Sequence, residues 1–392
     1  MTTHYAYSPE LHPTEYLDEM TVGDGRLVKR IAERIRLAAR SGTRAHTLIT
    51  GARGTGKTHT LAVAVGRASA SRTVANKVSV VWLGDGALET NSYTDFLVNA
   101  ITQIDPLVAS DIVLRRADYN AAALEEMLTT ALNGRVLVLV IESLDAVFDR
   151  IGIAGTRALR GFVETHSDTL VLASAPTLFP AVSSRTQPWF GNFDIERTRQ
   201  LTVRECTELL RRRGNDTALA AYLDGAESRD AIDVVYQALG GAARVWHLIA
   251  DTATPETLSD PAETINKALD MLTPSYHAIL SELPNVERAV IVTLGRGNGD
   301  AHAFTVGELA AHSGITANTA AVTLRRLTEH NWVVGAKRPG ADQRRTYYHL
   351  TDPLLETYIR RQTPHRAAST SRGNDEQLPH SFRNQKPTVT GR

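Results

Sequence analysis

Short apolar runs alternate with helical periodicities in the first half of the chain. Apolar runs of about four to eight residues predict buried strands, whereas apolar residues that recur every three or four positions predict helices. The expected strands span residues 47–50, 78–83, 135–142, 169–174 and 199–203, and the expected helices span residues 27–39, 59–70, 93–104 and 121–132. Strands that alternate with helices indicate an α/β fold with a parallel sheet.

The pattern changes after residue 203, where helical periodicity continues to about residue 271. Thr202 and Glu205 have the spacing of a capping box, which predicts that a helix begins there and spans residues 203–213. Residues 273–284 then fit either a linker or the first helix of a last domain.

The order of the elements after residue 300 predicts a winged helix-turn-helix domain. It consists of a short strand with a helix, a second helix, and two strands around a basic loop. These elements occupy residues 304–314, 316–327, 332–334 and 346–350, and the loop occupies residues 337–345.

The second helix of this domain has a small apolar face and a polar face. Its expected inward positions are Ala317, Ala320, Ala321, Leu324 and Leu327. Its expected outward positions are Asn318, Thr319, Val322, Thr323, Arg325 and Arg326. Such a helix can enter the major groove of DNA, with the basic loop contacting phosphates.

Residues Gly51–Thr58 carry the candidate chemistry, because they satisfy the phosphate-binding pattern G-x-x-x-x-G-K-[ST] between an expected strand and an expected helix. Glycines at positions 51, 54 and 56 allow backbone N–H groups to point toward an anion at the helix N-terminus. Lys57 would reach the β- and γ-phosphates of ATP, and Thr58 would bind Mg²⁺. The candidate nucleotide ligands are Gly51, Ala52, Arg53, Gly54, Thr55, Gly56, Lys57, Thr58 and His59.

Two polar residues end central strands beside this loop. The unbroken apolar run at residues 135–141 indicates a strand at the centre of a parallel sheet, and it ends in Glu142. Ligands bind at the carboxyl ends of such strands, so Glu142 is the candidate Walker B acid that orients the Mg²⁺ shell, with Thr58 as the other metal ligand. Ser174 ends the strand at residues 169–174, and its hydroxyl could contact the γ-phosphate or the attacking water.

Composition and charge indicate the cellular compartment and the class of partner. The chain has 392 residues and a single cysteine, Cys206, which excludes an intramolecular disulfide and suits a reducing cytoplasm. No apolar run approaches the length of a membrane span and residues 1–10 lack the pattern of a signal peptide, so a cytoplasmic protein without membrane contact is expected. Residues 301–361 carry eight Lys/Arg against five Asp/Glu, and residues 362–392 carry five against two, which is consistent with a polyanionic partner or with a solvated surface.

These motifs together resemble the AAA+ and STAND-like P-loop ATPases, in particular origin-recognition-type initiators and archaeal-type ATPases with a C-terminal winged helix. The resemblance covers roughly residues 20–361 and implies that Glu142 is the metal acid, Ser174 the first sensor and Arg244 the second sensor. Residues 315–333 are similar to the recognition helix and first wing strand of MarR-type regulators, with Asn331 where glycine is usual. The implied DNA-binding residues are Asn318, Thr319, Thr323, Arg326, Lys337, Arg338, Arg344 and Arg345.

The resemblance also implies five segments. They are an N-terminal arm at 1–21, a P-loop ATPase core at 22–201, a helical lid at 202–272, a winged helix-turn-helix domain at 273–361 and a basic tail at 362–392. The tail has few bulky apolar residues, so we expect it to be disordered.

One position departs from the family. The catalytic glutamate that usually follows the metal acid is replaced by Ser143, so ATP hydrolysis is expected to be slow. Asp145 is a possible substitute. If chains assemble side by side into a homo-oligomer, Arg185 is a candidate arginine finger for a neighbour's γ-phosphate.

Two functions remain open, and a third is disfavoured. In the first, the nucleotide state controls binding of the winged helix to double-stranded DNA. In the second, the protein is a signalling or phage-defence switch whose winged helix is a clamp or a protein-interaction module. Exposure of Arg325, Arg344 and Arg345 favours the first function, and their burial favours the second. A metabolic kinase would need an acceptor site, and the sequence offers none that is recognisable.

Overall fold

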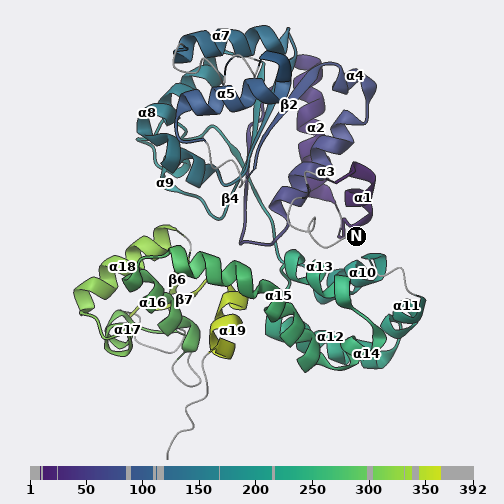
Figure 1. Ribbon diagram of the computed structural model, residues 1–392, viewed down its shortest axis with the longest axis vertical. Coiled ribbons are helices and arrows are strands. Elements are labelled where there is room, and N and C mark those ends of the chain that lie inside the picture. The colour runs from purple at the N-terminus through teal and green to yellow at the C-terminus, as the bar shows by residue number, and fades with distance from the viewer. Residues whose placement is uncertain are drawn as a thin grey trace, which may run out of the picture.

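The computed structural model describes residues 9, 12–23, 25–84, 90–108, 112, 119–166, 168–213, 217–297, 303–330, 332–337 and 344–362 (Figure 1). The tail at 363–392, Asn331 and Arg338 lie outside these residues. No helix among the described residues is sufficiently long and apolar to span a membrane.

A five-stranded sheet organises the first half of the chain. Its order is β2-β3-β4-β1-β5, and every neighbouring pair is parallel. The strands are β1 (Thr47–Thr50), β2 (Val78–Leu83), β3 (Val136–Ile141), β4 (Thr169–Ala175) and β5 (Asp194–Arg197). The predicted parallel α/β fold is thus confirmed.

Helices cover both faces of this sheet, which explains why β3 and β4 are apolar without alternation (Figure 1). Ile49 and Val138 belong to one core with α2 and α3, while Leu48 and Leu137 belong to the other core with α5, α7 and α8. The helices of this half are α1 (Thr14–Glu19), α2 (Arg26–Ser41), α3 (Lys57–Ser69), α4 (Arg72–Ala75), α5 (Tyr93–Ile104), α7 (Ala121–Leu132), α8 (Leu144–Thr165) and α9 (Pro180–Ser183).

The last strand lies earlier than the sequence predicted. Residues 199–203 were expected to form it, but β5 is Asp194–Arg197, whose side chains are mostly exposed. Charged pairs with α2 cover this edge strand: Arg30 with Glu196 at 2.9 Å, and Arg34 with Asp194 at 3.1 Å. An exposed, charged edge strand has no apolar pattern that a sequence analysis could detect.

The capping box explains why residue 203 instead begins a helix. Thr202 Oγ1 accepts a hydrogen bond from Glu205 N at 3.3 Å, and Glu205 Oε2 accepts one from Thr202 N at 2.8 Å. The ion pair with Arg199 holds the pKa of Glu205 down to about 2. This capping box was predicted from the sequence and is confirmed.

A group of helices follows the sheet. They are α10 (Val203–Arg213), α11 (Thr217–Leu223), α12 (Ala226–Leu239), α13 (Ala243–Thr252), α14 (Pro255–Ser259) and α15 (Pro261–Glu282). Helix α15 contains Pro274 and runs from this group to the C-terminal elements (Figure 1). Residues 273–282 are therefore helical, and the boundary expected at 272/273 falls within α15.

The C-terminal elements from Phe304 to Leu350 have the order that the sequence predicted, and two helices that it did not predict, α16 (Asn285–Arg296) and α19 (Pro353–Gln362), flank them. The elements between these helices are α17 (Val306–Ser313), α18 (Ala317–Glu329), β6 (Val333–Ala336) and β7 (Tyr347–Leu350). Strands β6 and β7 pair in antiparallel fashion, and Phe304 forms a bridge with Tyr348. We call residues 285–362 the C-terminal domain.

The buried face of α18 differs from the predicted face. Thr323, which was expected to point outward, is only 6% exposed, whereas Ala317 and Ala321, which were expected to point inward, are exposed. Ala320, Leu324 and Leu327 are buried as expected. Positions 320, 323, 324 and 327 follow the i, i+3, i+4, i+7 spacing of one helical face, and a threonine at one of them is hidden despite its hydroxyl.

Candidate nucleotide-binding site

The phosphate-binding loop joins β1 to α3 with the backbone that its glycines permit. Gly54 and Gly56 have φ angles of 80° and 88°, in the left-handed region that residues with a Cβ rarely adopt. Gly56 caps the N-terminus of α3. The loop therefore presents a helix N-terminus to the space in front of it, which favours an anion.

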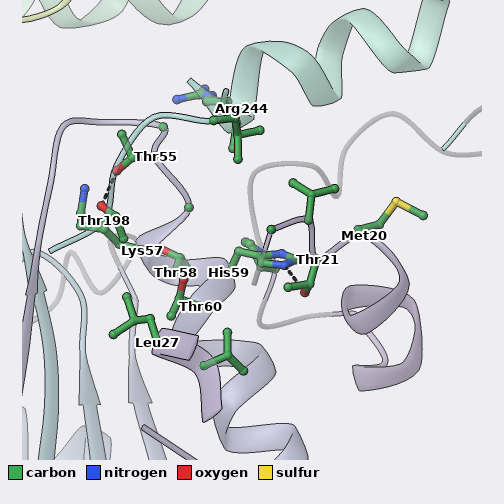
Figure 2. Close-up of a pocket in the computed structure, with 18 of the residues that line it drawn as sticks. Met20, Thr21, Leu27, Thr55, Lys57, Thr58, His59, Thr60, Thr198 and Arg244 are labelled. Carbon is green, nitrogen blue, oxygen red and sulfur yellow. Dashed lines mark hydrogen bonds between the residues drawn. The ribbon is translucent and has the colours of Figure 1, made fainter. Parts of the chain in front are cut away.

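Side chains of the loop hold its shape. The Lys57 ammonium donates hydrogen bonds to the carbonyl oxygens of Gly51 and Ala52, at 2.7 and 3.0 Å. Thr55 Oγ1 donates to the Ala52 carbonyl at 2.8 Å and lies 2.7 Å from Thr198 Oγ1 (Figure 2). Thr198 follows β5, so the end of this edge strand supports the loop.

Glu142 lies beneath the loop and is only 6% exposed. Its Oε2 atom accepts a hydrogen bond from Thr58 Oγ1 at 2.6 Å, and its Oε1 atom accepts one from Trp82 Nε1 at 2.7 Å. Because Thr58 opens α3, Glu142 follows β3 and Trp82 lies near the end of β2, three elements meet at this carboxylate.

A carboxylate beside a threonine hydroxyl at a phosphate loop fits the coordination of Mg²⁺, which is commonly bound by one or two protein oxygens plus phosphate oxygens and water. Among the described residues, no three His, Cys, Asp or Glu side chains cluster as a metal site of their own. Glu142 and Thr58 would therefore hold the metal together with a nucleotide.

The residues predicted to act in hydrolysis differ in whether they line the cleft. Ser143 has a φ of 48°, and its N–H donates to Ser174 Oγ at 3.4 Å. Both residues line the cleft in front of the loop, whereas Asp145, in the first turn of α8, does not. Arg185 is exposed beyond α9 and also lies outside the cleft.

Arg244 connects the loop to α13. Its backbone N–H donates to the Gly54 carbonyl at 3.1 Å, and its guanidinium donates to Ser275 Oγ on α15 at 3.4 Å. Figure 2 shows Arg244 on the side of the loop that carries Thr55. The predicted second sensor thus lies against the phosphate loop.

The cleft has a volume of about 1080 Å³, and its lining includes apolar side chains as well as the loop. The apolar side chains come from residues 12–23, which we call the N-terminal segment, from the start of α2 and from α10, and they include Leu17, Met20, Val22, Leu27, Val28 and Leu209. Apolar side chains beside a phosphate site suit the flat apolar faces of a nucleobase.

Polar contacts fasten the N-terminal segment across the cleft. Arg212 of α10 donates to the Thr21 carbonyl at 2.7 Å, and Arg213 donates to the Tyr16 hydroxyl at 2.8 Å. Thr21 Oγ1 lies 2.9 Å from His59 Nε2 (Figure 2). The N-terminal segment therefore bridges α3 and α10, a role that no motif in the sequence indicated.

Two buried imidazoles, those of His59 and His247, line the cleft. Burial lowers the pKa of His59 to about 4 and that of His247 to about 3, so both rings are neutral near pH 7. The sequence did not point to Tyr16, Arg213 or His247, because they meet only through tertiary packing. Trp82 lies in a strand that the sequence predicted, but its contact with Glu142 depends on the pairing of β2 with β3, which the sequence did not predict.

The candidate DNA-binding residues of the C-terminal domain differ in their exposure to solvent. Asn318 is exposed, and Thr319 is half-buried, with its hydroxyl 2.8 Å from that of Thr316. Arg326 is paired with Glu287 of α16 at 2.9 Å, and Thr323 is buried. The exposed cations of this domain include Arg325, Lys337, Arg344 and Arg345, while Arg338 lies outside the described residues.

No protein-family model matches the chain, and no curated protein sequence matches it. Solved structures do. The Orc1 protein of Aeropyrum pernix, solved in complex with DNA, is 14% identical, with 91% of this chain and 96% of that chain covered and a TM-score of 0.55. A Walker-type ATPase of Pyrococcus abyssi is 12% identical, with 85% and 95% covered and a TM-score of 0.58. The chain therefore has the fold of the AAA+ P-loop ATPases to which these structures are related.

Proposed function

We propose that this protein binds ATP with Mg²⁺ and that the bound nucleotide controls DNA binding by a C-terminal winged helix. The observation that carries the nucleotide part is the loop of residues 51–58 with Lys57 at its centre and the Thr58–Glu142 contact of 2.6 Å beneath it. A phosphate site, a metal pair and an apolar compartment share one cleft. That combination suits a nucleoside triphosphate.

Calorimetry tests ATP binding. Lys57→Ala should abolish binding of Mg·ATP, because the charge-assisted contacts to the β- and γ-phosphates centre on this ammonium. Lys267→Ala is a matched control, since Lys267 is a surface lysine of α15 paired with Glu263. Equal affinities of the wild type and Lys57→Ala for Mg·ATP would remove the proposal.

DNA binding is supported by the exposed cations Arg325, Arg344 and Arg345 on a domain with the element order of a winged helix. The Orc1 structure that this fold resembles is a DNA complex. We propose double-stranded DNA as the partner, with α18 directed to the major groove and the β6–β7 hairpin to phosphates. Titration of DNA without nucleotide, with ADP and with ATP tests the control by nucleotide, which fails if the three affinities agree.

A second function, an interaction switch without DNA, is favoured by the packing of α19 on the lid helices. Thr357 Oγ1 donates to the Ala238 carbonyl at 3.2 Å, and Arg361 donates to the Asn266 carbonyl at 3.1 Å. A C-terminal domain that packs there could act as a clamp in a signalling or defence protein. Absence of any salt-dependent DNA binding would favour this function.

We further propose the division into segments that the sequence suggested, with the lid and the C-terminal domain meeting within α15. Residues 12–21 of the arm then serve as a wall of the nucleotide cleft, on the grounds of the Arg212 and Arg213 contacts. Hydrolysis is proposed to be slow, and Arg185 remains a proposed finger for a neighbouring copy, because its exposure leaves it accessible to a second chain.

A further inference from the structure

The phosphate loop, the lid and the C-terminal domain meet at one small pocket beside the nucleotide cleft. Its lining includes Arg53, Arg244, Ser275, Tyr276 and Asp352. Arg53, Gly54 and Arg244 line both this pocket and the nucleotide cleft. The two arginines therefore stand between the place where phosphates would bind and the first turn of α19.

Asp352 is the acidic group on the far side of these arginines. Its Oδ2 atom accepts a hydrogen bond from the Tyr276 hydroxyl of α15 at 3.0 Å, and its Oδ1 atom accepts one from Leu354 N at 2.9 Å. Burial raises the pKa of Asp352, while these hydrogen bonds and the charge of Arg53 act in the opposite direction.

Both arginines also act on the hydroxyl that contacts Asp352. Burial raises the pKa of Tyr276, the neighbouring Asp352 adds to this effect, and the charges of Arg244 and Arg53 oppose it. Arg53 and Arg244 thus lie within electrostatic range of the Tyr276–Asp352 pair. Arg53 is exposed, but Tyr276 is only 8% exposed, so nearby charges act on its hydroxyl more strongly than they would on an open surface.

We propose that Asp352 and the phosphates of a bound nucleotide compete for Arg53 and Arg244, so that nucleotide binding weakens the attachment of the C-terminal domain to the lid. This inference rests on the proposed nucleotide binding and names how that site is regulated. A nucleotide that draws the two guanidinium groups toward its phosphates removes their electrostatic support from the Tyr276–Asp352 pair. By linkage, detaching the C-terminal domain must raise nucleotide affinity by the same factor.

The substitution Asp352→Asn isolates the charge. Asparagine keeps an oxygen that can accept from Leu354 N, and it is as good an N-cap as aspartate, so α19 should begin as before. The amide offers the arginines no negative charge. Glu356→Gln is the matched control, because it makes the same change one turn later on α19, at a residue paired with Arg360.

The first measurement is calorimetry of Mg·ATP with the full-length protein. Asp352→Asn should bind about 5-fold or more tighter than wild type, within the range of typical coupling between sites. Tyr276→Phe removes the hydroxyl donor and leaves the charge of Asp352 in place, and it should also raise the affinity for Mg·ATP, because it weakens the contact between α15 and Asp352. Glu356→Gln should match wild type.

The second measurement follows the C-terminal domain directly. Cys206 is buried and is the single cysteine, so Ile153→Cys on α8 and Val286→Cys on α16, both at exposed positions, can carry a pair of fluorescent dyes. Mg·ATP should change the energy transfer in the wild type. In Asp352→Asn the transfer should already be shifted in that direction without nucleotide, and Mg·ATP should change it less.

The outcomes separate this inference from the proposed function. If the wild type binds Mg·ATP but Asp352→Asn and Tyr276→Phe keep its affinity and its change in energy transfer, the competition is wrong and ATP binding stands. If the wild type binds no Mg·ATP in the calorimeter, both are wrong. Weaker rather than tighter binding by Asp352→Asn, with an unchanged melting temperature, would also overturn the competition.

Discussion

Thr58 and Glu142 lie 84 residues apart in the chain, and the hydroxyl of one donates to the carboxylate of the other at 2.6 Å. The contact joins the start of α3 to the end of β3, so the two candidate metal ligands are positioned by the central layers of the fold. Trp82 fixes the second carboxylate oxygen at 2.7 Å. Under the proposed function, a metal would replace the hydrogen bond between these two oxygens, and Lys57 would turn from the loop carbonyls that it now contacts toward the phosphates.

Glu142→Gln should remove most of the gain in ATP affinity that Mg²⁺ provides, because an amide is a poorer ligand for this hard cation than a carboxylate. Affinity for ATP without Mg²⁺ should remain within a few-fold of wild type. Calorimetry with and without the metal measures both quantities. Trp82→Phe is the companion variant, since it removes one hydrogen bond to Glu142 and should lower the gain only partly.

ATP turnover should be slow, and Asp145 should contribute little to it. A positioned general base is worth about 10²–10⁴-fold in rate, and under the proposed function Ser143 would stand where the resemblance to AAA+ ATPases implies that base. Asp145 does not line the cleft, so Asp145→Asn should leave single-turnover hydrolysis within about two-fold of wild type. Loss of all turnover in this variant, without loss of ATP binding, would identify Asp145 as the base.

The stability of the core should fall as the pH is lowered from about 6.5 to about 4. His46 Nδ1 accepts a hydrogen bond from Val171 N at 3.0 Å, and burial lowers the pKa of His46 from 6.5 to about 4. Between these values the unfolded chain binds a proton that the folded chain does not, so acid favours unfolding. Melting temperatures measured from pH 7 to pH 4 record the slope.

His46→Asn tests the source of this slope. An asparagine oxygen can replace the Nδ1 acceptor and does not titrate, so the decrease in melting temperature between pH 7 and pH 5 should be smaller by a few degrees. His277→Asn, at an exposed position of α15, should leave the slope as it is in the wild type. An unchanged slope in His46→Asn would assign the acid sensitivity to other groups.

The elements that the sequence predicted correctly have a clear hydrophobic pattern within their own residues. Strand β3 is an unbroken apolar run, and α5 and α7 have the boundaries that their periodicity indicated. Strand β5 was misplaced because Asp194–Arg197 is charged, and it becomes a strand only by pairing with β1. Local pattern therefore identifies the buried layers and misses the edge.

The residues of the candidate site also fall into those that the local sequence pattern identified and those that it missed. The loop at 51–58 and Glu142 are contiguous with strong strand and helix patterns, which made them detectable. The wall at Tyr16, Arg213 and His247 combines three segments that no motif connects. On α18, Thr323 was assigned to the polar face because of its hydroxyl, yet a small β-branched side chain at that position packs as an apolar residue would.

The exposed cations of the β6–β7 hairpin should dominate any DNA affinity and make it strongly salt-dependent. Each phosphate contact contributes a slope of about −0.9 in a plot of log affinity against log salt. Arg344→Ala with Arg345→Ala should therefore reduce the magnitude of the slope by about 1.8 and leave the ranking of DNA sequences unchanged. Arg229→Ala, an exposed position of α12, should leave the slope unaltered.

The exposed end of α18 should act on sequence preference instead. Asn318 is exposed near the N-terminus of α18, the end that contacts base edges when such a helix enters the major groove, so Asn318→Ala should change the ranking of DNA sequences and hardly affect the slope. Thr323→Val should alter neither quantity, because Thr323 is 6% exposed and packs inside the domain. Binding titrations over a panel of duplexes at several salt concentrations measure both effects. A slope that the arginine pair does not change would mean that the hairpin does not face DNA, and the clamp would then be the better proposal.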